Sequence, residues 1–272
     1  MKALRIIVVI MFVLASAATA FLVVREELST DRTIPEIKVE TEMIDVSLKA
    51  TDEELLQGVI AYDKKDKDLT DKVIVESMSR FIEKGVCKVT YAVCDSDNNV
   101  AKATRLVRFT EYESPKFRIV GNLCFSLYEH IDIRELIIAQ DSLEGNISSQ
   151  LVVTSGDYST SIAGAFSLDV SVTNQKGDTS VIKLPLIVED RPLSVPQIEL
   201  SEYLVYTKVG QPISFDSYIV DALDMNETSL RGSVIIESNV DFNKPGTYHV
   251  HYYATDSLGN RGHSIMTVIV EE

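Results

Sequence analysis

The sequence predicts an all-β protein in which three tandem Greek-key β-sandwiches follow one N-terminal transmembrane helix. Three observations lead to this prediction. An uncharged run of nineteen residues lies near the N-terminus, a 25-residue pattern of alternating apolar residues then occurs three times, and an Ala-x-Asp signature precedes each copy at nearly constant spacing. Self-similarity at a fixed period indicates repeated structural units.

The uncharged run, Ile6 to Val24, has the length of a membrane span. Nineteen residues at about 1.5 Å each form a helix of about 28 Å, close to the ~30 Å hydrocarbon core of a bilayer. Lys2 and Arg5 precede the run. The positive-inside rule therefore predicts a short cytoplasmic end, residues 1–5, and an extracellular location for the C-terminal domains.

A cleaved signal peptide is the alternative to this anchor. Ala18-Thr19-Ala20 has the small-x-small pattern that signal peptidase prefers, and cleavage near Ala20 would release a secreted protein. Phe21 to Val24 continue the apolar run to full spanning length. We therefore favour an uncleaved signal anchor in a single-pass membrane protein.

The repeated pattern has two parts. The distance from the Ala of the first part to the Gly that opens the second is 24 residues for Ala61, 25 for Ala139 and 24 for Ala222. The second parts are the blocks 85–109, 164–188 and 246–270. A period of about 80 residues is long enough for a small domain with its own core.

Within each block the residues alternate as they do in half-buried strands. Cys87, Val89, Tyr91 and Val93 share one face of the first copy, and Tyr248, Val250, Tyr252 and Ala254 share the matching face of the third. Residues 95–99 and 256–260 have turn chemistry, Asp-Ser-x-x-Asn or its variant, so each block predicts a β-hairpin. Short strands with regular turns are typical of Greek-key sandwiches.

The combined pattern A-x-D…D-L-T…G-x-x-x-V-x-Y-x-x-x-D-S-x-x-N resembles the bacterial immunoglobulin-like (Ig-like) repeats of the DUF5011 type. Such repeats occur in tandem on surface proteins of Gram-positive bacteria and in some pesticidal crystal proteins. The second copy departs from the pattern, because Asn174 replaces the hairpin Asp and Val170 stands in the position of Tyr91. The resemblance implies Ig-like domains at a cell surface and no chemistry of their own.

Prolines mark the junctions between the copies, at Pro35, Pro115 and Pro192 to Pro196. The predicted organisation is a cytoplasmic end (1–5), a transmembrane helix (6–24), a linker (25–33), Ig-like domain 1 (34–112), a divergent Ig-like domain 2 (113–190) and Ig-like domain 3 (191–272). Placed end to end, three such domains would extend about 60–100 Å at ~3.3 Å per strand residue.

Composition excludes one class of partner. The net charge is −15 and the isoelectric point is about 4.7, whereas a nucleic-acid phosphate backbone needs a basic face.

The three cysteines leave at least one thiol without a partner in the chain. Cys87 and Cys94 are expected at the two ends of one strand, too far apart for a disulfide.

One acidic cluster is a candidate for calcium. Clustered carboxylates on adjacent loops supply the six to eight oxygens that Ca²⁺ requires. The competing interpretation is that these aspartates cap turns through bonds to the backbone. The candidate ligands are Asp63, Asp66, Asp68, Asp95 and Asp97.

The last hairpin presents a second cluster, of histidines. His249, His251 and Tyr253 are expected on its outward face, with Tyr253 opposite His263 and His251 on the diagonal. No carboxylate partner is evident in the sequence, so we expect a contact patch for a partner and no metal.

The sequence predicts a protein without enzymatic activity. It contains no G-x-S-x-G elbow, no Gly-rich phosphate loop and no H-E-x-x-H motif. We expect no cofactor other than the candidate Ca²⁺ and no small-molecule substrate. The predicted role is a spacer and adhesion or ligand-binding module at the cell surface, its cell-wall or protein ligand unknown; the alternative is an accessory subunit that docks on an envelope or wall-assembly complex.

Overall fold

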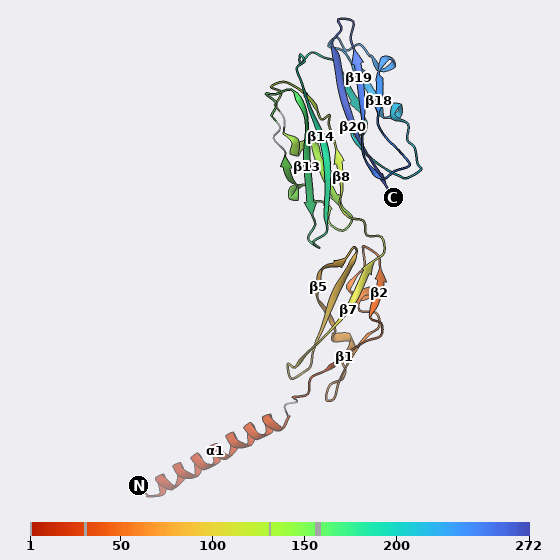
Figure 1. Ribbon diagram of the computed structural model, residues 1–272. Helices are drawn as coiled ribbons and strands as arrows, with labels where there is room; N and C mark the ends of the chain where they lie inside the picture. Colours follow the sequence, from red (N-terminus) through yellow and green to blue (C-terminus); the bar gives the residue numbers. More distant parts are fainter. Residues whose placement is uncertain (1, 30–31, 131, 156–158) are drawn as a thin grey trace. The chain divides into compact units, whose positions relative to one another are not determined.

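The computed structural model describes residues 2–29, 32–130, 132–155 and 159–272 (Figure 1). Met1 of the predicted cytoplasmic end and residues 30–31 of the predicted linker lie outside the described residues. The chain forms two compact units, Met1–Glu111 and Tyr112–Glu272. The all-β architecture and the N-terminal apolar helix that the sequence predicts are both confirmed.

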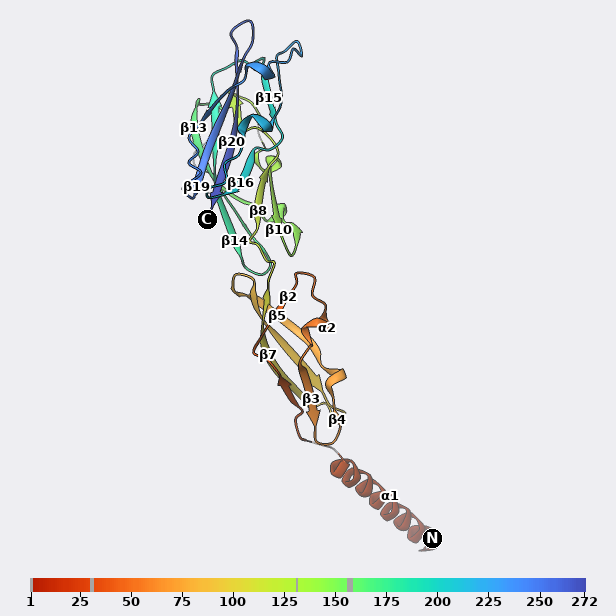
Figure 2. The same cartoon turned by 90° about the vertical axis from the view of Figure 1, so that its right-hand side faces the viewer.

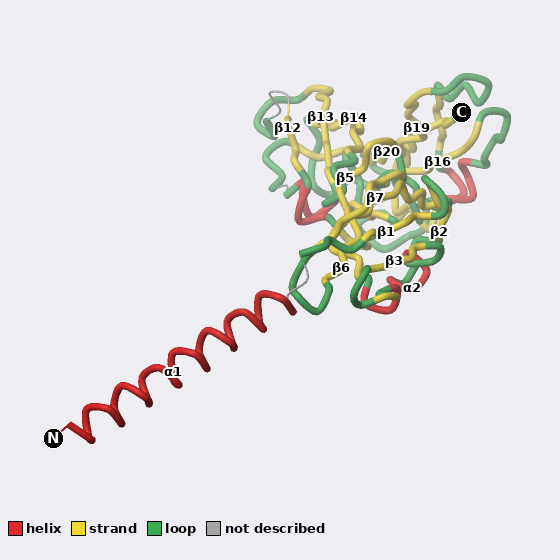
Figure 3. The backbone as a smooth tube through the Cα atoms, turned by 90° about the horizontal axis from the view of Figure 1, so that it is seen from below, coloured by secondary structure: helices red, strands yellow, loops and turns green. Residues whose placement is uncertain are grey.

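The one long helix, α1 (Lys2–Ser29), is drawn red in Figure 3. Its segment Ile6–Arg25 has a mean hydropathy of 2.8 and no buried residue. By length and composition this segment is able to cross a membrane, and an N-terminal signal sequence would have the same properties. The helix continues past Val24 into the predicted linker.

The first sandwich, β1 to β7, contains two sheets. One has the order β1-β3-β4 and the other β2-β7-β6-β5, in which β2 runs parallel to β7. The connection from β2 to β3 contains a short helix, α2 (Asp52–Leu55; Figure 2). Thr51 and Glu54 cap its N-terminus reciprocally. The strands are β1 (Glu36–Val39), β2 (Met43–Val46), β3 (Val59–Asp63), β4 (Lys67–Asp68), β5 (Ile74–Glu83), β6 (Val86–Cys94) and β7 (Val100–Phe109).

The second sandwich, β8 to β14, repeats this arrangement with sheets β11-β10-β8 and β12-β13-β14-β9. Here β9 runs parallel to β14, as β2 does to β7. The strands are β8 (Lys116–Ile119), β9 (Cys124–Ser126), β10 (Ile137–Asp141), β11 (Gly145–Asn146), β12 (Val152–Ser155), β13 (Gly164–Thr173) and β14 (Thr179–Glu189).

The third sandwich, β15 to β20, has the sheets β15-β17 and β16-β20-β19-β18, again with one parallel pair, β16 and β20. Its strands are β15 (Gln197–Leu200), β16 (Leu204–Lys208), β17 (Ile219–Leu223), β18 (Ile235–Ser238), β19 (Gly246–Thr255) and β20 (Arg261–Glu271). Single 3₁₀ turns connect strands in all three sandwiches: η1 (Thr70–Lys72), η2 (Ile133–Leu136), η3 (Ser148–Gln150), η4 (Phe215–Tyr218) and η5 (Arg231–Ser233).

The three predicted hairpins are β6–β7, β13–β14 and β19–β20. The register pairs the first and last residues of the predicted blocks, Gly164 with Val188 and Gly246 with Val270. The predicted inward residues are buried: Val89 and Tyr91 are 0% exposed, as are Val250 and Tyr252. Cys87 and Cys94 begin and end the same strand, as expected.

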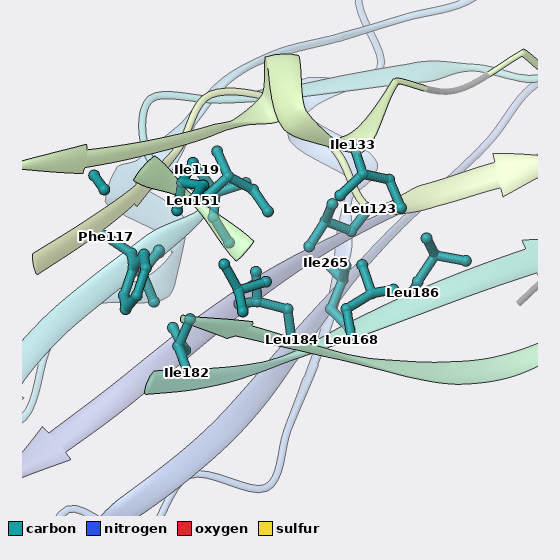
Figure 4. Close-up of a cluster of buried hydrophobic side chains, with 14 of the residues drawn as sticks. Phe117, Ile119, Leu123, Ile133, Leu151, Leu168, Ile182, Leu184, Leu186 and Ile265 are labelled. Carbon is teal, nitrogen blue, oxygen red and sulfur yellow. The ribbon is translucent and has the colours of Figure 1, made fainter. Parts of the chain in front are cut away.

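The second and third sandwiches pack against each other (Figures 1 and 2). Leu204 and Ile265 of the third sandwich are 5% and 2% exposed because they join the apolar core of the second. Figure 4 shows Ile265 beside Leu123 and Leu186 of that core. The expectation of three sandwiches end to end is therefore wrong for these two.

The cause is the outward face of the β16-β20-β19-β18 sheet, which is not uniformly polar. Ile265 pairs with His251 in the register and so lies on the same face. An apolar side chain on this face is stabilised by burial, and the open edge of the second sandwich, at β8 and β9, provides the cover. Phe117 on β8 donates its backbone N–H to the Tyr206 hydroxyl on β16 at 3.1 Å.

Candidate functional site

The acidic cluster of the first sandwich brings three of the five predicted ligands together. Carboxylate oxygens of Asp63, Asp66 and Asp95 all lie within 4.8 Å of one another. Asp63 ends β3, Asp66 lies in the turn to β4, and Asp95 begins the β6–β7 turn. Two turns at one end of the sandwich therefore build this cluster.

The other two predicted ligands point elsewhere. Asp68 accepts the backbone N–H of Thr70 at 2.9 Å, which starts η1. Asp97 forms an ion pair with Lys65. Neither carboxylate belongs to the three-residue cluster within the described residues.

Backbone N–H groups surround the cluster. Asp63 Oδ1 accepts from the N–H groups of Lys65 at 2.7 Å and Asp66 at 2.9 Å, and Asp95 Oδ1 accepts from Asp97 at 2.9 Å and Asn99 at 2.8 Å. These bonds are the turn caps of the competing interpretation. The Asp66 N–H is the main cause that lowers the pKa of Asp63, so this carboxylate is charged at neutral pH.

Asp66 links the two turns. Its Oδ2 accepts from the backbone N–H of Ser96 at 3.0 Å and from the Ser96 hydroxyl at 2.9 Å, and these bonds lower its pKa. Three negative charges thus meet in a small volume, with oxygen lone pairs that a hard cation would use. Calcium binding at this cluster stays a prediction.

The second sandwich fills the equivalent position with neutral donors. Asp141 corresponds to Asp63, but Asn174 stands in the place of Asp95. The Asn174 amide donates to Asp141 Oδ2 at 2.9 Å and to the Tyr112 hydroxyl at 2.8 Å. Tyr112 donates to Asp178 at 2.8 Å, and burial raises its pKa. An amide therefore faces Asp141 where the first sandwich has a carboxylate facing Asp63.

A second cluster lies where the third sandwich meets the second. His251 Nδ1 is 2.9 Å from His263 Nε2, and His263 Nδ1 is 2.8 Å from Glu189 Oε1. The predicted proximity of these two histidines is confirmed. No carboxylate partner is evident in the sequence, but the structure provides one, because Glu189, at the end of β14, pairs with His263 across the interface.

Aromatic and cationic side chains enclose these groups. The Tyr253 ring stacks on His263 with centroids 4.5 Å apart, and the Arg261 guanidinium lies 3.7 Å above the Tyr253 ring. Arg191 Nη1 is 3.2 Å from Glu189 Oε2 and its Nη2 donates to the Cys124 carbonyl at 3.1 Å. The Glu189 carboxylate thus has partners on both oxygens.

Hydrogen bonding and burial lower the pKa of three side chains in and beside this cluster. The bond from His263 lowers the pKa of Glu189, so its carboxylate is charged at neutral pH. Burial lowers the pKa of His251, and the neighbouring His263 lowers it further. Burial also lowers the pKa of His249. Both imidazoles are therefore held in the neutral form more strongly than a solvated histidine.

Sequence reasoning did not identify Glu189, Arg191 or Asn122 as members of this cluster. Asn122 donates its amide to the His263 carbonyl at 2.8 Å and accepts the Ile265 N–H at 3.2 Å. Glu189 is 74 positions from His263 and Asn122 is 143 positions from Ile265, and no local pattern reports such a contact. The predicted partner residues His249, His251 and Tyr253 are half-buried, and their contact with an external partner stays a prediction.

Comparison with known proteins finds a similarity to one family within the third sandwich. Residues 205–270 match the sequence profile of the family described as "Bacterial surface protein, Ig-like domain". An uncharacterised 81.3 kDa protein of Acholeplasma phage L2 is 32% identical over 50% of this chain, and the pesticidal crystal protein Cry22Aa of Bacillus thuringiensis is 27% identical over 78%. The chain spans 19% and 30% of the length of these two relatives.

Among solved structures, the lipoprotein BT2262 from Bacteroides thetaiotaomicron is 29% identical over 28% of this chain and 37% of its own, with a TM-score of 0.24. A ZmpB structure from Clostridium perfringens that contains CBM51-2 and INT domains is 22% identical over 50% of this chain and 29% of its own, with a TM-score of 0.26.

Proposed function

We propose that this chain is a non-enzymatic surface protein of a bacterial cell, held to the membrane by α1, whose sandwiches act as spacer and ligand-binding modules. The observation that carries the proposal is the match of residues 205–270 to a bacterial surface Ig-like domain in a chain that begins with an apolar helix. These two features support an extracellular array on a single span.

All three sandwiches are Ig-like repeats of the DUF5011 type in this proposal. The repeated strand pairing supports it, because each sandwich has one parallel pair at the same place in its larger sheet. The similarity to a pesticidal crystal protein over 78% of the chain extends beyond the third sandwich and supports it further.

Packing between the second and third sandwiches suits a spacer. A shared apolar core and polar bonds from Asn122 and Glu189 hold them as one unit. A unit of this kind has fewer interdomain motions than domains joined only by a linker.

An exposed groove on the third sandwich supports the docking role. Leu193 is 71% exposed and Met225 63%, and with Leu223 they line a groove of about 260 Å³. Asp224 and Glu227 also line it. Exposed apolar side chains with polar neighbours mark many protein–protein contacts. This groove favours the alternative in which the chain is an accessory subunit of an envelope complex.

The anchoring is tested by separating membranes from medium and sequencing the N-terminus of the protein in each fraction. We expect the full chain in the membrane, with the sandwiches removed by protease added outside intact cells. A matched variant, Ala18→Leu with Ala20→Leu, destroys the cleavage pattern and should behave identically. A wild-type chain that begins at Phe21 in the medium, with the variant retained in the membrane, would contradict the anchor.

The two binding roles are separated by affinity capture with the intact protein. One envelope protein recovered at equal stoichiometry, and lost in Met225→Ser, indicates an accessory subunit. Binding to purified wall or host matrix without such a protein indicates adhesion. The control is Val220→Ser on β17, because the Val220 side chain is 50% exposed and does not line the groove.

A further inference from the structure

We propose that the packing of the third sandwich on the second responds to protons: the chain of contacts Glu189–His263–His251 holds the two together near neutral pH and releases them when both imidazoles are protonated. The interface joins β14 of one sandwich to β19 and β20 of the other. The site assigned here is a pH-sensitive contact inside the protein, and it does not depend on any external ligand.

In the neutral state both contacts of this chain are hydrogen bonds with one donor and one acceptor. His263 donates its Nδ1 proton to Glu189 Oε1, which leaves Nε2 as an acceptor. His251 then donates its Nδ1 proton to that acceptor across 2.9 Å. This arrangement fixes the tautomer of each ring and needs one carboxylate and two neutral imidazoles.

One additional proton is accommodated without a broken bond. It binds His251 Nε2, which makes His251 a cation that still donates to His263 through Nδ1. Glu189 supplies the opposite charge next to His263. A second additional proton binds His263 Nε2, and two N–H groups then face each other across the same 2.9 Å between two cations. That state loses the hydrogen bond and adds repulsion.

The surrounding charges do not offset the second cation. Glu189 from β14 and Glu237 from β18 favour protonation, while Arg191, which follows β14, and Arg261 from β20 oppose it. The remaining titratable groups around the two imidazoles are His249 and Tyr253 from β19 and Cys124 from β9; burial raises the pKa of Tyr253 and of the Cys124 thiol, so both are neutral.

Burial makes the contact sensitive to this repulsion. His263 is 6% exposed, so water cannot screen its charge while the sandwiches stay packed. Opening solvates both imidazoles, and protons therefore bind the open form more tightly. The folded pKa of His251 lies below its ordinary value of 6.5. The stabilisation is complete above about pH 6.5 and is lost as the pH falls below the folded pKa of His251, when the second proton binds.

Hydrogen exchange of the full chain in detergent tests the proposal. The Ile265 N–H, which donates to Asn122 across the interface, reports packing directly. We expect its protection to fall on the order of tenfold between about pH 7.5 and pH 5, after correction for intrinsic exchange, while the β6–β7 hairpin of the first sandwich keeps its protection.

Two substitutions isolate the imidazole pair. His251→Gln keeps a donor toward His263 but cannot be charged, so the loss of protection at low pH should disappear. His249→Gln is the matched control, because His249 lies on the same strand, is also half-buried and makes no side-chain bond to His263. An interface whose protection does not change with pH, or a transition that both variants remove equally, would overturn the proposal.

A second measurement remains valid if His251→Gln misfolds. In the wild-type chain, imidazole NMR signals of His251 and His263 should titrate in two separated steps, with the second step coincident with loss of protection at Ile265. The exposed His130 gives the reference titration. Two imidazoles that titrate independently, each like His130, contradict the proposal.

Discussion

The first and second sandwiches share one pattern of strand pairing but differ in what they bury. At the same position of the hairpin block the first has Arg105, the second Leu184 and the third Met266. Arg105 is 2% exposed, and its guanidinium donates to the Tyr91 hydroxyl and to the carbonyl groups of Leu55 and Gln57. The same backbone therefore accepts a charged or an apolar side chain, if the charged one finds acceptors.

The acceptors come from the end of the short helix α2 and the residues after it. The Leu55 carbonyl ends the helix and the Gln57 carbonyl follows it, and both accept from the hairpin where Arg105 and Tyr91 lie. In the third sandwich Tyr252 donates to the Phe215 carbonyl at 3.1 Å, and Met266 fills the remaining space. Local differences in the connection between strands thus decide which side chain the core accommodates.

The same contrast appears at the turns. Asp63 and Asp95 face each other in the first sandwich, whereas the Asn174 amide donates to Asp141 in the second. Strand pairing depends on the alternation of apolar residues and is retained in all copies. Polar clusters depend on single residues and diverge, so they are where separate functions can arise.

The largest effect is expected at Arg105. Arg105→Ala removes the guanidinium donors to the Leu55 and Gln57 carbonyl groups and opens a cavity in the core, and we expect it to destabilise the first sandwich by about 3–5 kcal/mol. Arg105→Met, which copies the third sandwich, loses the same donors but fills most of the space, so it should cost less than about 1.5 kcal/mol. Urea unfolding of both variants measures the difference, and equal costs would contradict the comparison.

The next largest effect is expected where the second and third sandwiches pack against each other. Ile265→Ala removes an apolar side chain from the core shared by two sandwiches, and we expect a loss of about 2–4 kcal/mol in the unfolding of residues 112–272. Val220→Ala, at a side chain 50% exposed on β17, should change it by less than about 0.5 kcal/mol. Unfolding of the first sandwich should be unchanged in both variants.

The sequence was sufficient for the parts of the fold that depend on local pattern. Alternation located the three hairpins and their inward faces, and hydropathy located α1. The burial of Ile265 could not be predicted from the sequence. This residue lies on the outward face of its hairpin, opposite His251, and only the second sandwich covers it. Glu189 was missed for the same reason: its distance of 74 residues from His263 is bridged only by packing.

A smaller effect is expected where the turns differ. Asp95→Asn copies Asn174 and gives the first sandwich an amide that can donate to Asp63, so its melting temperature in calcium-free buffer should rise. A calcium ion bound by the wild-type cluster would raise the melting temperature at millimolar Ca²⁺, and the variant would lose this response. Asp178→Asn in the second sandwich is the control. A wild-type melting temperature that calcium leaves unchanged contradicts the calcium prediction.

The smallest effect is expected at low pH. Backbone N–H groups hold the pKa of Asp63 and Asp66 below the ordinary value of 3.8, so both carboxylates favour folding above that value. This contribution is lost as the pH falls through the folded pKa. The melting temperature of the first sandwich should therefore decrease below about pH 4, and the decrease should be smaller in Asp63→Asn, whose amide oxygen still caps the turn but does not titrate. Identical pH profiles for the two proteins would show that the turn bonds do not stabilise the charged form.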